Sequence, residues 1–138
     1  MKGSKLAEEV FEQGELAGDR ITKLEPCKAE NFGGGCLQGM FVGVTYAELC
    51  NIFGPPNSNG DGYKIDVEWL FTASAVIHGL YHLELNVSIY NWKNGPNYNP
   101  EKDFKVEYIE EWHVGGKSAY GKDIVLLALE RLNDVGIL

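Results

Sequence analysis

The stretch YKIDVEWLF, residues 63–71, carries an apolar or aromatic side chain at every second position. Because successive side chains of a strand point to opposite faces, this spacing predicts an antiparallel strand with one buried face. Residues 83–89, LELNVSI, repeat the alternation and predict a second such strand. The polar positions in between, Asp66 and Glu68 among them, are then expected on a solvent-facing side.

Weaker patterns extend this sheet in both directions. Residues 104–114 predict a further strand, in which Glu110 interrupts the apolar face and indicates a bulge. Residues 21–24 predict a short strand, and residues 73–80 fit either a third strand that turns near His78-Gly79 or a loop. Asn94-Gly95 is typical of a tight turn.

Two helices accompany the strands. Thr45 and Glu48 form a capping box, in which each side chain accepts a hydrogen bond from the backbone of the other. Gly54, with two prolines after it, ends the predicted helix over residues 46–53. A second helix is predicted to begin near Ser118. The fold class that follows is α+β, an antiparallel meander with two helices packed on one face.

A chain of 138 residues is long enough for one domain. Residues 41–138 are predicted to be a single α+β ligand-binding domain. Residues 1–40 are interpreted as an N-terminal arm or extra edge strand, because the three glycines at 33–35 favour a flexible connector. Within this arm, residues 5–11 are compatible with a short helix.

The charge balance narrows the range of partners. A formal net charge of −8 argues against binding to genomic nucleic acid or to an anionic membrane surface. No apolar run reaches the roughly 18 residues of a membrane span, and the chain does not open with a signal-peptide pattern. Cys27, Cys36 and Cys50 are odd in number and widely spaced, which predicts reduced thiols in a cytoplasm.

The string GGKS, residues 115–118, lies between a predicted strand and a predicted helix. A phosphate-binding loop of the ATPase type requires a glycine where this chain has Glu111, so that motif is absent. Gly115, Gly116 and Lys117 still form a candidate anion site, with free backbone amides and a cation at a helix N-terminus. The alternative is a flexible strand-to-helix turn.

Neither a metal, a cofactor nor a catalytic group is expected. His78 and His82 lie four residues apart, but a zinc-protease helix requires a glutamate where Gly79 stands. On a strand the two histidines are about 13 Å apart, too far to share a metal. The sequence also lacks the Gly-x-Ser-x-Gly turn of serine hydrolases, so the protein is not predicted to be an enzyme.

Residues 90–99, YNWKNGPNYN, combine aromatic rings, amides and a lysine at the end of a predicted strand. Amides can bind a base edge, rings can stack on a base, and lysine can contact a phosphate. Asn91 stands on the apolar face, where it requires a backbone or ligand partner. Trp92 and Lys93 are further candidate contacts, and Tyr81 and His113 are candidate stacking walls. The alternative is a hairpin turn with a structural asparagine.

Six ordered segments resemble small bacteriophage and prophage proteins: TYAEL (45–49), FGPP (53–56), GDGYK (60–64), DVEW (66–69), IYNWKNG (89–95) and EWHVGG (111–116). Over about residues 40–132 the chain is similar to the first family of phage Thoeris anti-defence proteins. The resemblance implies a noncatalytic protein of the host cytoplasm. Such a protein sequesters cyclic ADP-ribose isomers made by bacterial TIR-domain proteins, so that the defence effector is not activated.

The same resemblance implies an antiparallel sheet with two helices, dimer-based assembly up to hexamers, and in some members sequestration of cyclic oligonucleotides. It makes Asn91 the leading polar contact, makes Tyr81 a stacking ring, and places Lys117 where the family has an arginine. The chain departs from the family in having only Arg20 and Arg131 as arginines, and in a longer, more apolar stretch over residues 72–83.

Two rival functions stay open. The acidic charge also fits a protein inhibitor of a bacterial nuclease, such as a CRISPR effector, that acts by surface mimicry. The second rival is a hydrolase that degrades the signal. A hydrolase would convert the ligand to a product, whereas a capturing protein would release it intact.

Overall fold

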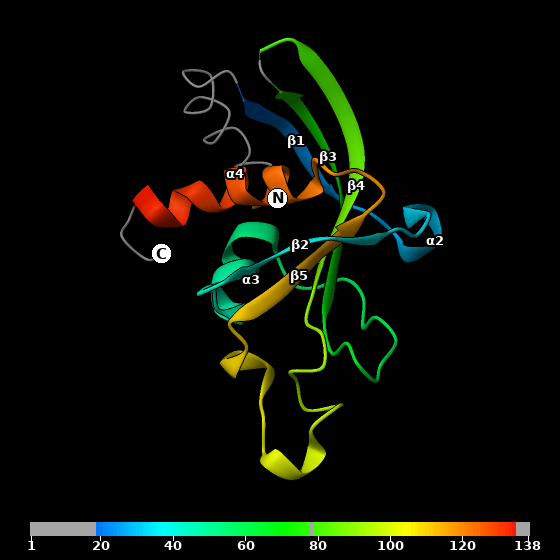
Figure 1. Cartoon of the computed structure of the whole chain (residues 1–138), viewed down its shortest axis with the longest axis vertical. Coiled ribbons are helices and arrows are strands. Elements are labelled where there is room, and N and C mark those ends of the chain that lie inside the picture. Colours follow the sequence, from blue (N-terminus) through cyan, green and yellow to red (C-terminus); the bar gives the residue numbers. More distant parts are fainter. Residues whose placement is uncertain (1–18, 78, 135–138) are drawn as a thin grey trace.

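The computed structural model describes residues 19–77 and 79–134, so the short helix considered at residues 5–11 lies outside the described residues. Five strands form one open antiparallel sheet in the order β1-β3-β4-β5-β2 (Figure 1). The strands are β1 (Arg20–Pro26), β2 (Cys36–Val42), β3 (Glu68–Ile77), β4 (Tyr81–Tyr90) and β5 (Glu111–Gly116). The predicted α+β class is confirmed.

One face of the sheet carries α3 (Tyr46–Phe53) and α4 (Gly121–Asp134), which lie on the same side in Figure 1. The core between this face and the helices contains Trp112, which is fully buried and donates its indole N–H to the Val44 carbonyl at 2.7 Å. The predicted arrangement of two helices on one face is confirmed, with α4 beginning at Gly121 rather than at Ser118.

The capping box at the start of α3 is confirmed. The Thr45 hydroxyl accepts from the Glu48 amide at 3.2 Å, and Glu48 Oε1 accepts from the Thr45 amide at 2.8 Å. The helix ends at Phe53, and Gly54 follows with a φ of 81°. The local pattern thus sets both ends of this helix.

The prediction of a strand over residues 63–71 is wrong in its first half, because β3 begins only at Glu68. Asp61 Oδ1 accepts hydrogen bonds from the amides of Tyr63, Lys64 and Ile65, all at about 3 Å. These three amides are therefore held in a turn and cannot join a strand ladder. The carboxylate of Asp61 overrides the alternation that follows it.

The predicted strand over residues 104–114 is also shorter than expected. Residues 106–108 form a 3₁₀ turn, and β5 begins at Glu111, so Glu110 precedes the strand and forms no bulge in it. For residues 73–80 the sequence allows either a strand or a loop. Residues 73–77 are strand, because β3 continues to Ile77. Ile77 pairs with Tyr81 of β4, so β3 and β4 form one long hairpin.

Residues 20–26 and 36–42 supply both edge strands, so the boundary expected after residue 40 falls inside β2. Between them, α2 (Ala29–Phe32) and the three glycines at 33–35 cross to the face of the sheet opposite α3 and α4 (Figure 1). Among residues 19–77 and 79–134, no helix is both long and apolar enough to span a bilayer.

Candidate ligand-binding site

The second face of the sheet, called here the outer face, consists of the strand residues that point away from α3 and α4. Asn86 of β4 fastens α2 over this face: its Nδ2 donates to the Phe32 carbonyl at 2.9 Å, and its Oδ1 accepts from the Thr72 hydroxyl at 2.8 Å. The side chain of Asn86, which belongs to β4, therefore bonds both α2 and the neighbouring strand β3. Because α2 and the three glycines after it cover this part of the outer face, they are called the roof below.

A cavity of about 330 Å³ lies between this roof and the sheet, and is called the outer-face cavity below. Its volume is within the range of small-molecule sites. Its walls come from α2, the glycine loop and strands β2 to β5. They are Ala29, Phe32, Gly34, Gly35, Cys36, Glu68, Leu70, Ser88, Tyr90, Gly115 and Gly116.

Two of the predicted site positions, Gly115 and Gly116, have no room for a side chain. A Cβ on Gly115 would stand 2.7 Å from Ser88 Oγ and 3.0 Å from Tyr90 Cε1, so a side chain there would fill the space between them. A Cβ on Gly116, whose φ is 140°, would meet the Asn86 carbonyl oxygen at 2.7 Å. Gly115 thus keeps the cavity open beside the sheet, whereas glycine at 116 is required by the backbone of β4. Both glycines lie in β5 between β2 and β4, so they do not form the free-amide loop that the sequence predicts.

Three polar side chains face the cavity. Ser88 is only 4% exposed, and its hydroxyl has no hydrogen-bond partner among the described residues. Glu68 accepts from the Ser58 hydroxyl through Oε1 at 2.9 Å, and burial raises the pKa of its carboxyl above the ordinary 4.5. Burial, together with the nearby Glu68, also raises the pKa of the Tyr90 hydroxyl.

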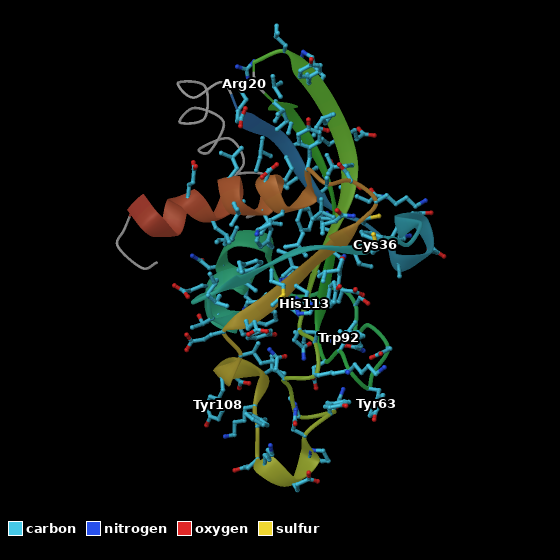
Figure 2. The ribbon with its side chains drawn as sticks, in the orientation of Figure 1. Arg20, Cys36, Tyr63, Trp92, Tyr108 and His113 are labelled. Atoms are coloured by element: carbon cyan, nitrogen blue, oxygen red, sulfur yellow. The ribbon has the colours of Figure 1, made fainter. Side chains whose placement is uncertain are left out.

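An aromatic surface adjoins the cavity at Tyr90. The ring of Tyr90 meets His113 edge-on at 5.5 Å, and His113 stacks on Trp92 at 6.3 Å with an interplanar angle of 23°. Figure 2 shows Trp92 and His113 close together near the end of the sheet. Burial lowers the pKa of His113, because the charged imidazolium loses solvation between the two rings.

Two lysines lie over this aromatic surface. Lys64 Nζ is 5.4 Å and Lys93 Nζ 5.8 Å from the centre of the Trp92 ring, and Lys93 Nζ is also 5.7 Å from that of Tyr98. Lys93 has a φ of 62°, an uncommon value for a residue with a side chain. The strand end therefore presents rings and cations together, as the composition of residues 90–99 indicates.

Lys117 lines a second cavity of about 320 Å³ on the far side of the glycine loop. Phe32 and Gly34 belong to the walls of both cavities, and Lys117 Nζ lies 3.5 Å from the Cβ position of Gly33. Ser118, Asn86 and the exposed Glu84 complete the polar part of its lining. The predicted cluster Gly115-Gly116-Lys117 is therefore split between two adjoining cavities.

Asn91 requires a correction. It is 0% exposed, its Oδ1 accepts from the amides of Asp66 and Val67 at 2.7 and 3.1 Å, and its Nδ2 donates to Asp66 Oδ1 at 2.8 Å. It is a structural residue that no ligand can reach in this fold. Asp66 is buried with it, contrary to the solvent-facing position expected from alternation.

Tyr81 also stands apart from the other predicted residues. It is 61% exposed and lies at the β3–β4 turn, at the opposite end of β4 from Tyr90. At about 3.3 Å per residue, nine residues of strand separate the two rings by roughly 30 Å. Tyr81 therefore cannot form one wall of a site with Trp92 and His113.

Sequence reasoning missed Glu68, Ser88 and Cys36 as cavity residues, and it included Tyr90 only among the rings of residues 90–99. Their alternation does place Glu68, Ser88 and Tyr90 on one face, and β3–β4 pairing sets Glu68 opposite Tyr90. The sequence does not show that α2 and the glycines cover these side chains, because nothing in residues 29–35 indicates that they cross the outer face. Without the roof these side chains look like an ordinary solvated surface.

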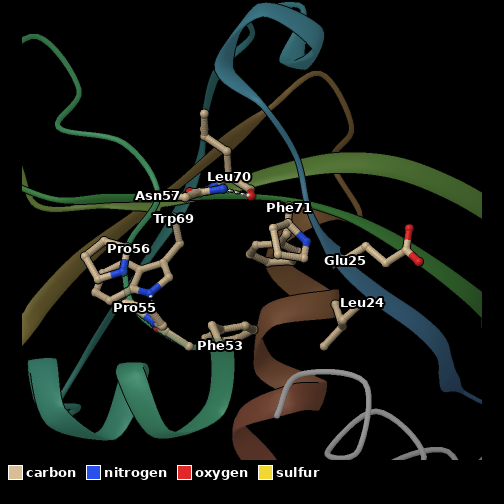
Figure 3. Close-up of a pocket in the computed structure, with 11 residues that line it drawn as sticks. Leu24, Glu25, Phe53, Pro55, Pro56, Asn57, Trp69, Leu70 and Phe71 are labelled. Atoms are coloured by element: carbon tan, nitrogen blue, oxygen red, sulfur yellow. Dashed lines mark hydrogen bonds between the residues drawn. The ribbon is translucent and has the colours of Figure 1, made fainter. Parts of the chain in front are cut away.

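A third cavity, of about 260 Å³, is apolar and lies on the helix side of the sheet (Figure 3). Phe53 and Phe71 stack at 5.1 Å within it, and Trp69 forms another wall. Its principal polar side chain, Asn57, already bonds the backbone of Leu70 in both directions, at 2.9 and 2.8 Å. This cavity offers shape but little polar recognition, so the outer-face cavity is the stronger candidate.

Residues 19–77 and 79–134 contain no group of three or more His, Cys, Asp or Glu side chains placed to hold a metal ion. No protein-family model, curated protein or solved structure matches this chain.

Proposed function

We propose that this protein is a noncatalytic anti-defence protein of phage or prophage origin, which captures a cyclic nucleotide signal. The signal is an isomer of cyclic ADP-ribose or a cyclic oligonucleotide, and holding it prevents activation of a host defence effector in the cytoplasm. The proposal rests on the sequence resemblance and on one structural observation, the outer-face cavity with its unpartnered Ser88 hydroxyl beside the Trp92–His113 stack.

Each part of such a ligand has a matching surface. Trp92 and His113 offer ring faces for a base, a contact worth about 1–3 kcal/mol per base. Lys117 and Lys93 offer charge for phosphates, and the outer-face cavity offers hydroxyls and a carboxyl. Capture requires affinity and no reaction, so a preformed cavity is sufficient for it.

Homo-oligomerisation belongs to the same proposal. β2 is an edge strand whose outward residues Leu37, Met40 and Val42 are 51%, 41% and 67% exposed, and Met40 pairs with His113. An exposed apolar strip on an edge strand is typical of an interface. A second copy on β2 would stand beside the aromatic surface.

The decisive test is capture followed by release. Isomers of cyclic ADP-ribose and a cyclic dinucleotide are titrated into the protein by calorimetry, and the bound fraction is then freed by denaturation and identified by mass spectrometry. Capture predicts tight binding and intact ligand. Altered ligand would establish a hydrolase, and absence of binding together with a stable complex with a nuclease would establish the inhibitor.

The cavity is tested with a matched pair of variants. Gly115→Ala places a methyl group between Ser88 and Tyr90 and should abolish binding, whereas Gly121→Ala meets only ordinary contacts of 3.7 Å or more and should keep it. Thermal melting of both variants checks that the fold is retained. Equal binding by the two would exclude the outer-face cavity as the site.

A further inference from the structure

The charges that line the outer-face cavity determine which part of a nucleotide, its phosphates or its sugar and base, can enter it. Its lining contains one acidic side chain, Glu68, and neither lysine, arginine nor histidine. A phosphate placed there would lie beside a carboxyl group in a poorly solvated space, where like charges repel strongly. The cavity therefore disfavours the anionic part of the ligand.

The polar atoms in the cavity are suited to hydroxyl or amino groups. Glu68 uses Oε1 for Ser58, which leaves Oε2 as an acceptor, and a carboxylate can accept from two hydroxyls of a sugar or from an exocyclic amine. Ser88 is 4% exposed as a residue, and its Oγ, which has no hydrogen-bond partner among the described residues, can donate and accept. This hydroxyl faces the cavity and is therefore available to a ligand group that enters it.

The cation needed for phosphate stands outside this space. Lys117 belongs to the adjoining cavity, and its Nζ lies close to Gly33, on the loop between the two cavities. Glu84 also lines that cavity, but it is exposed, so solvent and salt screen its repulsion of a phosphate. A ligand that spans the loop can therefore place its neutral part under α2 and its phosphates near Lys117.

We infer that Glu68 and Ser88 form a subsite for the uncharged, donor-bearing part of the nucleotide, its ribose hydroxyls or the amino edge of its purine, with the phosphates held outside near Lys117. This inference rests on the proposed function and deepens it. Glu68 and Ser88 become the residues that determine specificity, and Lys117 contributes charge.

The test measures the dissociation constants of three probes: a cyclic ADP-ribose isomer that binds the unmodified protein, adenosine, and inorganic pyrophosphate. Glu68→Gln and Ser88→Ala should each weaken the cyclic nucleotide about tenfold or more, because each loses a buried hydrogen bond. They should weaken adenosine in the same proportion. Ser74→Ala, on the outer face but outside the cavity lining, is the control and should have no effect.

Lys117→Gln should weaken the cyclic nucleotide and flatten its salt dependence while leaving adenosine unchanged. The inference is overturned if Glu68→Gln strengthens binding of the cyclic nucleotide, because that result would place phosphate beside the carboxyl. It is equally overturned if pyrophosphate competes in a manner sensitive to Glu68, or if neither Glu68→Gln nor Ser88→Ala changes affinity. Failure of every cyclic ADP-ribose isomer and of the cyclic dinucleotide to bind the unmodified protein would instead refute the proposed function.

Discussion

The side chain of Asn91 and both the backbone and side chain of Asp66 form a closed pair of hydrogen bonds inside the protein. Asn91 Oδ1 accepts from the Asp66 amide at 2.7 Å, and Asn91 Nδ2 donates to Asp66 Oδ1 at 2.8 Å. Asp66 Oδ2 in turn accepts from the Asn97 amide at 3.0 Å. These hydrogen bonds join the loop before β3, which carries Lys64, to the loop after β4, which carries Trp92.

Asn91→Ala should therefore destabilise the fold. The change leaves the amides of Asp66 and Val67 without their acceptor in a buried place, at a cost of about 2–3 kcal/mol. Urea denaturation measures it, and Asn59→Ala, an exposed position in a loop, serves as the control with an expected change near zero. Normal stability combined with lost ligand binding would make Asn91 a ligand contact after all.

The requirement for a partner at Asn91 could be predicted, but the identity of that partner could not. Alternation places Asn91 on the apolar face, which correctly indicates a buried amide. The same alternation places Asp66 on the opposite face, because it assumes that the strand starts at Tyr63. The Asp61 turn shifts the start to Glu68 and releases Asp66 to fold back onto Asn91.

The helices and the paired strands follow from local patterns, whereas the cavity does not. The capping box sets α3, and period-two alternation sets β4 and the first part of β3, residues 68–71. The outer-face cavity arises because Asn86 holds α2 across the sheet, a contact between residues more than 50 positions apart. Long-range contacts of this kind leave no periodic signal in one sequence.

Thr45→Ala should remove the N-cap of α3. The Glu48 amide would lose its acceptor, and the reciprocal bond from the Thr45 amide would lose its fixed geometry. The expected loss is about 1 kcal/mol of unfolding free energy, measured by chemical denaturation. Thr45→Ser keeps the hydroxyl and should retain most of the stability, so an equal loss in both variants would show that the methyl group matters and the cap does not.

His113 should titrate below its ordinary pKa of 6.5, because burial between Tyr90 and Trp92 disfavours the imidazolium. Between the folded and unfolded pKa values the unfolded chain binds more protons, so this contribution to stability is present above pH 6.5 and is lost as the pH falls through the folded pKa. NMR titration of the ring measures the pKa directly.

Trp92→Ala should expose the imidazole and move the pKa of His113 back toward 6.5. Tyr98→Ala is the matched control, because the Tyr98 ring packs against Tyr63, at 5.3 Å and tilted by 46°, and not against His113. A His113 pKa that stays low in Trp92→Ala would attribute the shift to the rest of the pocket and would weaken the case for a shared stacking surface.

The two edge strands of the sheet, β1 and β2, differ in how well they are protected from pairing with a strand of another molecule. This difference predicts which edge binds a second copy of the protein. β1 carries Lys23 and Glu25, which form an ion pair at 3.4 Å, and it ends in Pro26. β2 carries no charged residue and no proline over CLQGMFV. Charge and proline are the usual means of blocking an edge, so β2 is the open one.

Met40→Lys should therefore convert the oligomer expected in solution to monomer, as measured by light scattering during size exclusion. The ammonium group would face the apolar strip of the second copy, whereas in the monomer it would project into solvent without disturbing the core. Leu80→Lys, an equally drastic change on the exposed β3–β4 turn, should leave the mass unchanged. A protein that is monomeric before any substitution, or an oligomer that survives Met40→Lys, would exclude β2 as the interface.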